Sequence, residues 1–403
     1  MTPNTASGWR QLLAPRAAGV VYAFVALVVT LTVASDLQGR PSYLRSVNIA
    51  NVLDQTALVG ILAVFMTVVL ITGNFDLSVA STAALSGTVA LTLVDEHGAF
   101  VALVAALLSG AAVGTLNGVL VQKVGVNAFI VTLGTLTAVR GIVQAILEGQ
   151  SITATNTVFL DFGTARATLP RPVAVAAGAA LLVAGVAIAL RRREGRFAPG
   201  AHLALGLAGV AVLALATAAP RLLTQTAPVW LLLVLAVLTS LVLRYTVVGR
   251  NLYAVGGNAE AARLSGIDVD RYRMGAFVLN GVVAGGVGVL YAGRFNSVDP
   301  TVLTGAELTV IAAAILGGTS LFGGSGYVAK SVVGALVLFT LSNGFNVLNI
   351  GANYQNVVQG GVLIAAASLY TVTALRRRSA PRDDDRPEPA PPVPVEPAEA
   401  IRI

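Results

Sequence analysis

Charged side chains are scarce in this sequence: Asp, Glu, Lys and Arg make up only 11% of its 403 residues. A soluble globular chain carries about 25%. Because a charge at the centre of a bilayer costs roughly 2.5–3.5 kcal/mol, uncharged runs such as 173–190 and 226–243 are typical of membrane-spanning helices. The composition therefore argues against a soluble protein and predicts an all-α polytopic membrane protein.

Cysteine is absent and histidine occurs twice, at His97 and His202. Without cysteine there can be no disulfides or thiolate metal sites, and two isolated histidines offer no metal-ligand spacing. We therefore expect no metal and no cofactor. The formal net charge is +7, but the arginines gather at the ends of apolar spans and do not interleave with aromatic residues. This distribution indicates membrane topology, and no nucleic acid partner is expected.

Hydrophobic runs predict about twelve transmembrane helices, or ten to twelve if one pair of spans is a re-entrant segment. They lie near 17–34, 55–73, 77–94, 98–121, 126–147, 172–190, 201–219, 226–243, 274–293, 307–321, 327–345 and 354–375. The first run could instead be a cleavable signal peptide, with Thr32-Val33-Ala34 as its cleavage site.

Basic residues predict the orientation of these spans. Four arginine clusters, within 10–16, 191–196, 244–273 and 376–378, fall on one side if every span crosses once, and Lys123 agrees with them. The positive-inside rule places that side, and both termini, in the cytoplasm. Arg40 and Arg45 fall on the opposite side. We expect a cytoplasmic N-terminal segment at 1–16, a transmembrane domain at 17–375, and a disordered Pro-rich and acidic cytoplasmic tail at 376–403.

Glycine is abundant, with 42 residues, and some of it lies at helical small-xxx-small spacing. Gly110, Gly114 and Gly118 share one helix face, and Gly281 and Gly285 share another, which predicts close helix packing. Polar, glycine-containing breaks at 72–78 and 317–326 interrupt the spans in two distant parts of the chain. Paired breaks of this kind favour a transporter with repeated halves.

The loop 244–273 is longer than a simple turn between two spans needs. Asn258 is a suitable N-cap for a short helix over 259–264, and Gly266 is a suitable stop. Such a helix could dock into a groove of a cytosolic partner, or it could lie on the membrane surface without a partner.

Motifs in this loop resemble those of a known family, and the resemblance favours the helix that docks into a cytosolic partner. Glu260-Ala261-Ala262-x-x-x-Gly266 resembles the coupling loop of bacterial ABC importer permeases, although the downstream part of that consensus is missing at 276–278. The stretches 249–267, 55–81, 129–142 and 313–324 are similar to the ribose/xylose/galactose permease family. The resemblance implies the ABC importer permease fold, a cytosolic ABC ATPase subunit, an extracytoplasmic sugar-binding protein, a homodimer and a lipid bilayer. The coupling residues that it implies are Gly257, Asn258, Glu260, Ala261, Ala262, Arg263 and Gly266.

The extra pair of spans at 171–220 resembles the longer D-xylose permease branch, so D-xylose is the expected monosaccharide, with ribose and galactose as alternatives. A sugar path needs amides and hydroxyls. Its candidate path or gate residues are Asp76, Asn117, Arg140, Asn280 and Asn343. Each also has a structural interpretation: Asp76 can cap the helix after it, Arg140 can pair or snorkel, and buried amides can join helices.

The chain is not expected to be an enzyme or to bind nucleotide itself. The stretch 324–331 differs by one residue from a P-loop, but it connects two apolar spans and no strand precedes it. The main rival is an ion-coupled secondary transporter, which usually carries an acidic residue in mid-span. Here Asp54, Asp76 and Glu307 all lie near span ends.

Overall fold

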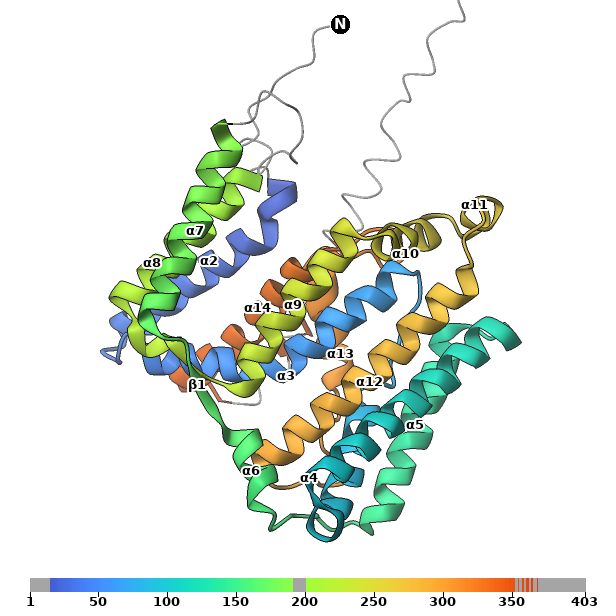
Figure 1. Cartoon of the computed structure of the whole chain (residues 1–403). Coiled ribbons are helices and arrows are strands. Elements are labelled where there is room, and N and C mark those ends of the chain that lie inside the picture. The colour runs from blue at the N-terminus through green and yellow to red at the C-terminus, as the bar shows by residue number, and fades with distance from the viewer. Residues whose placement is uncertain are drawn as a thin grey trace, which may run out of the picture.

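The computed structural model describes residues 15–190 and 201–351, with isolated positions from 354 to 368. The predicted tail 376–403, the arginines of 191–196 and most of the expected span 354–375 lie outside the described residues. The described chain is largely helical (Figure 1), which confirms the all-α class.

The long helices follow the predicted apolar runs, and shorter elements lie between them. The first are α2 (Pro15–Leu37), α3 (Ser46–Ile71), α4 (Val79–Val119), the π-helical turn η1 (Leu120–Val124), α5 (Ala128–Leu147), α6 (Thr157–Thr164) and β1 (Arg166–Thr168). Next come α7 (Arg171–Leu190), α8 (Ala201–Ala218), the 3₁₀ turn η3 (Pro220–Leu223), β2 (Thr224–Thr226) and α9 (Ala227–Tyr245). The last are α10 (Val247–Gly257), α11 (Ala259–Leu264), α12 (Val269–Phe295), α13 (Ala306–Leu316) and α14 (Val328–Val347).

Eight of these helices are long and apolar enough to cross a membrane, within the described part of the chain. They are α2, α3, α4 with η1, α5, α7, α9, α12 and α14. The apolar stretch Leu205–Ala218 of α8 and the helix α13 are shorter. A membrane protein with many spans is therefore confirmed, whereas the count of twelve stays a prediction.

Helix α4 is two antiparallel segments rather than one long rod. Gly98 interrupts it with φ 82° and ψ 166°, values that are open to glycine and strained for other residues. Ser86 and Ser109 then meet across the kink, with their hydroxyl oxygens 2.8 Å apart. This reversal agrees with the two separate spans predicted at 77–94 and 98–121.

Helix α3 forms the centre of the bundle, and its side chains from Thr56 to Ile71 are buried. It contacts α9, α12, α13 and α14. The most extensive pairing in the molecule is that of α4 with α12. There a Cβ at Gly110 would lie 2.2 Å from the Gly281 carbonyl oxygen, so the predicted small-residue faces pack against each other.

The hairpin of α7 and α8 is attached by a narrow base. Strands β1 and β2 pair antiparallel, with Arg166 opposite Thr226 and Thr168 opposite Thr224, and they bring the two ends of the hairpin together. The main helix contacts of α7 and α8 are with each other. In Figure 1 the hairpin lies on the opposite side of the molecule from α4 and α5.

The two ends of the bundle differ in the elements that they expose. Helices α10 and α11 lie at one end, and β1 and α6 lie at the other (Figure 1). Lys123 and Arg263 both contact Asp270, so Lys123 and the 244–273 loop share the α10–α11 end, as predicted. Which of the two ends faces the cytoplasm remains a prediction.

Candidate functional site

The predicted coupling loop folds into two short helices. Asn258 caps α11, since its Oδ1 accepts a hydrogen bond from the Ala261 N–H at 3.0 Å. Gly266, with φ +81°, ends the turn that follows. The predicted cap, short helix and stop are therefore confirmed as structure. Helix α10 was not predicted, because three glycines obscure its pattern; its signal was Thr246, whose Oγ1 accepts from the Gly249 N–H at 3.2 Å.

Helix α11 presents one face to solvent and one to the protein. Ala262 is buried in a small apolar cluster with Val255 and Val269, which fixes α11 to its neighbours. The exposed residues between 257 and 266 are Gly257, Asn258, Glu260, Ala261, Arg263, Leu264, Ser265 and Gly266. Six of these eight are predicted coupling residues. Of the other two, Leu264 is 86% exposed and places an apolar side chain at the tip of the molecule.

Helix α10 is in close backbone contact with the two polar breaks noted in the sequence. A Cβ at Gly256 would lie 1.7 Å from the Ile71 carbonyl oxygen, which only glycine avoids. The same oxygen accepts a hydrogen bond from the Gly324 N–H at 2.9 Å. A Cβ at Gly323 would lie 2.8 Å from Cα of Gly73. We call these five residues, Ile71, Gly73, Gly256, Gly323 and Gly324, the glycine junction.

Two side chains reinforce the junction. The Tyr253 hydroxyl donates to the Gly326 carbonyl oxygen at 2.8 Å, and burial raises the pKa of this phenol. Arg273 Nε donates to the Thr72 carbonyl oxygen at 3.3 Å. A cleft of about 610 Å³ opens beside the junction, between α10 and α12, and Gly266 is part of its lining. Because these backbones are in close contact, we expect a movement of α10 to be felt by the 72–78 and 317–326 segments.

Three of the predicted path residues, Asp76, Asn117 and Asn280, meet in one buried polar network. Asp76 Oδ2 accepts from Asn280 Nδ2 at 2.8 Å, and Asp76 Oδ1 accepts from the Ser78 N–H at 3.0 Å and from its hydroxyl at 2.6 Å. Asn117 Nδ2 donates to the Ser78 hydroxyl at 2.9 Å. Asn117 Oδ1 accepts from the Thr135 hydroxyl at 2.7 Å. The network joins the 72–78 segment to α4, α5 and α12.

Burial favours a structural role for this network. Asp76, Asn117 and Asn280 expose 2% or less of their surface. Asp76 binds the N–H that precedes α4, as the capping interpretation predicts. Among the described residues, Asn280 Oδ1 is a buried oxygen without a hydrogen-bond partner. Ser78 and Thr135 were missed as members, because hydroxyls are too common in a sequence to be singled out.

The other two candidate path residues lie elsewhere. Arg140 is half-buried on α5, and its Nη1 donates to the Val302 carbonyl oxygen at 2.6 Å, which agrees with the structural pairing considered for it. Asn343 is buried on α14, and its Oδ1 has no hydrogen-bond partner in the described part of the chain. Neither residue is part of the Asp76 network.

Comparison with known proteins now decides the family. Residues 48–367 match the profile described as "Branched-chain amino acid transport system / permease component". The chain belongs to this permease family. It is therefore a transporter component, and it is a multi-pass protein of the plasma (inner) membrane.

Individual relatives of this permease are named for sugars. The ribose import permease protein RbsC of Escherichia coli (strain K12) is 35% identical over 343 residues, which cover 85% of this chain and 90% of the relative. The xylose transport system permease protein XylH of the same strain is 35% identical over 370 residues, covering 89% and 93%. The L-arabinose ABC transporter permease protein AraH of Azospirillum brasilense is 33% identical over 362 residues, covering 90% and 89%.

These matches confirm the resemblance to bacterial sugar-importer permeases. The family description names amino acids, whereas these three relatives are named for pentoses. No solved structure matches the permease.

Proposed function

We propose that this permease is the membrane subunit of an ABC importer for a pentose, D-xylose in particular. A separate cytosolic ATPase supplies the energy, and an extracytoplasmic binding protein delivers the sugar. Two copies of the chain form the sugar path between them. The α10–α11 end faces the cytoplasm, in agreement with the arginines of the 244–273 loop.

The glycine junction is the observation that carries this proposal. Helix α11 is a small, capped and exposed helix that suits a groove on a partner protein. It continues directly from α10, and Gly256 of α10 touches Gly324 of the second polar break and Ile71, the last residue of α3 before the first break. A stroke of the ATPase against α11 would therefore reach the 72–78 segment, and from there the Asp76 network and α12. Through these contacts, a movement of the ATPase could be transmitted to the membrane-embedded helices.

The choice of D-xylose depends on the α7–α8 hairpin and on the relatives. The alignment with the xylose permease is 370 residues long and covers 89% of this chain, against 343 residues and 85% for the ribose permease at equal identity. The L-arabinose permease covers 90% of the chain at 33% identity. The longer match agrees with the resemblance of residues 171–220 to the xylose branch. Ribose and L-arabinose differ from D-xylose mainly in the orientation of hydroxyls, so they are the competitors to measure.

The test is sugar uptake by proteoliposomes that contain the permease, its ATPase and its binding protein. We expect ATP-dependent uptake of labelled D-xylose that exceeds uptake of ribose and L-arabinose. Gly266→Glu adds a charged side chain beside α11 and should abolish both uptake and co-purification of the ATPase. Gly149→Glu is the matched control, because Gly149 also has a positive φ (+78°) and open space around it, but lies beyond the outer end of α5.

Two results would overturn the proposal. The coupling role is wrong if Gly266→Glu retains uptake and ATPase association while the protein remains folded. The energy source is wrong if a protonophore abolishes uptake at constant ATP, since that result favours the ion-coupled transporter. If ribose or L-arabinose is taken up faster than D-xylose, that sugar is the substrate, and the proposed coupling mechanism is unaffected.

A further inference from the structure

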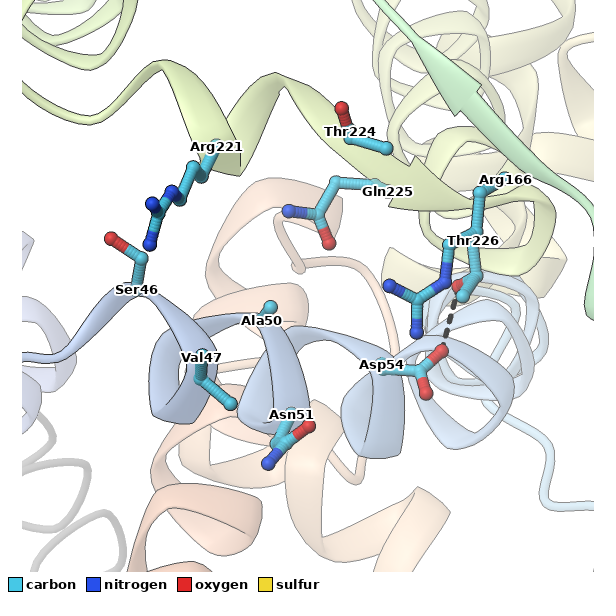
Figure 2. Close-up of a pocket in the computed structure, with 10 residues that line it drawn as sticks. All are labelled: Ser46, Val47, Ala50, Asn51, Asp54, Arg166, Arg221, Thr224, Gln225 and Thr226. Carbon is cyan, nitrogen blue, oxygen red and sulfur yellow. Dashed lines mark hydrogen bonds between the residues drawn. The ribbon is translucent and has the colours of Figure 1, made fainter.

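A polar cleft at the end of the bundle opposite α11 has no place in the transport mechanism above. It has a volume of about 220 Å³ and lies between the first turns of α3 and the segment from η3 to β2. Its polar lining residues are Ser46, Asn51, Asp54, Arg166, Arg221, Thr224, Gln225 and Thr226, joined by Val47 and Ala50. Figure 2 shows Arg221 extending toward Ser46, and Arg166 reaching over α3 near Asp54.

The cleft carries surplus positive charge. Asp54 is its only acidic lining residue, and that carboxylate already pairs with Arg294 and accepts from the Thr226 hydroxyl at 2.6 Å. Arg166 and Arg221 are exposed, and within the described chain neither guanidinium has a hydrogen bond or an ion pair. Two arginines without a carboxylate partner favour an anion, and their planar donor groups match phosphate oxygens.

The surroundings of the cleft have the residue types of a membrane–water interface. Trp230, in the first turn of α9, donates its indole N–H to the Ala167 carbonyl oxygen at 2.9 Å, beside Arg166. Tryptophan is enriched at the membrane–water interface. At the base of the hairpin, Val173 and Val175 of α7 and Leu215 of α8 expose apolar side chains, as does Val47 in the cleft itself. An anionic group held here would therefore have apolar surface next to it.

We propose that this cleft binds the phosphodiester headgroup of an anionic phospholipid, with the phosphate between Arg166 and Arg221. The acyl chains lie against the exposed apolar residues of the α7–α8 hairpin. Asn51 and Ser46 are available to the headgroup hydroxyls, whereas the Thr224 hydroxyl already shares a hydrogen bond with the Thr168 hydroxyl at 2.9 Å. A neutral sugar fits less well, because the lining contains no aromatic ring to stack on it and leaves two cationic groups unpaired. The bound lipid would fasten the hairpin to α3.

The experiment titrates the purified full-length chain in neutral detergent with phosphatidylglycerol or phosphatidylcholine and counts bound lipids by native mass spectrometry. We expect preferential binding of phosphatidylglycerol. Arg166→Gln with Arg221→Gln should weaken that binding roughly thirtyfold, since each basic residue near a lipid surface contributes about fivefold. Arg244→Gln with Arg250→Gln removes two exposed arginines from the opposite end and should leave it intact.

A third variant keeps the test independent of folding. Arg166→Lys with Arg221→Lys retains both charges and should bind the lipid more tightly than the Gln pair does. Equal losses in the Gln pair and the Arg244/Arg250 control would mean diffuse attraction and would overturn the site. Inorganic phosphate that binds as tightly as phosphatidylglycerol would replace the lipid with a soluble anion. Displacement of the lipid by D-xylose would make the cleft a sugar subsite.

Discussion

Asp76 is the residue on which the buried polar network depends. Its two oxygens accept hydrogen bonds from Ser78 and Asn280, all inside the bundle. Asp76→Ala would leave these donors buried and unpaired, at a cost of about 3 kcal/mol or more. Asp76→Asn should lower stability by only about 1 kcal/mol, because the new side chain keeps an oxygen for Ser78 and its amide can donate to Asn280 Oδ1 once the Asn280 amide turns over. That turn leaves only Asn280 Nδ2 unpaired, in the position where Oδ1 now has no partner.

Thermal unfolding in detergent checks the stability of both variants, and D-xylose uptake checks their function. A structural role for Asp76 predicts that Asp76→Asn keeps uptake while Asp76→Ala loses folded protein. If Asp76→Asn folds normally but does not transport, the negative charge itself is used and Asp76 acts as a gate.

Gly256, which belongs to the glycine junction, and its neighbour Gly257, which does not, form a matched pair. In an ordinary helix, replacing glycine by alanine stabilises by up to about 1 kcal/mol. At Gly256 the new Cβ would collide with the Ile71 carbonyl oxygen, whereas at Gly257 the nearest atom is 4.0 Å away. Gly256→Ala should therefore lower the unfolding temperature, and Gly257→Ala should not. Equal unfolding temperatures for the two variants would mean that the backbone contact at Gly256 is not tight.

At the scale of elements, the sequence was informative wherever the signals were local. The cap at Asn258 and the stop at Gly266 lie within nine residues of each other, so α11 could be predicted without the fold. Helix α10 escaped prediction because Gly249, Gly256 and Gly257 weaken its helical pattern. Gly256 is required by its backbone contact with Ile71 and Gly324, which are far away in the sequence, and such a contact leaves no local signal.

The α7–α8 hairpin behaves in the structure as a separable element. Its base is the β1–β2 ribbon, in which Thr168 lies opposite Thr224. Replacing 169–223 with Asn-Gly would close this ribbon as a two-residue β-turn. Because the hairpin contacts mainly itself, we expect the shortened permease to fold, insert and transport. Lipid binding should fall, since Arg221 is lost with the hairpin.

Gel filtration, thermal unfolding and D-xylose uptake of this deletion variant test the expectation. The matched control is a full-length chain in which Gly178→Leu separates α7 from α8, because a Cβ there already approaches the Gly209 carbonyl oxygen to 3.1 Å. A deletion variant that aggregates while this control folds would show that the hairpin supports the bundle.

At the scale of the whole molecule, contacts between distant segments were beyond prediction. Asp76, Asn117 and Asn280 were each singled out as polar residues in apolar surroundings. That they form one network depends on the packing of α4 against α12, which brings together residues 204 positions apart. The cleft that contains Arg166 and Arg221 likewise depends on the pairing of β1 with β2. Each of these strands has three residues, which is too short for an alternation of polar and apolar side chains to predict it.

The orientation of the bundle can be measured because the chain has no cysteine, so single introduced thiols are unambiguous. Leu264→Cys places a thiol at the exposed tip of α11, and Glu96→Cys places one beside the Gly98 kink of α4, at the opposite end. An impermeant maleimide should label Leu264→Cys only in inside-out vesicles and Glu96→Cys only in right-side-out vesicles. Bound ATPase should then protect Leu264→Cys alone, because α11 enters its groove. Reversed labelling would place α11 outside the cell, where no ATPase can reach it, and the coupling mechanism would fail with it.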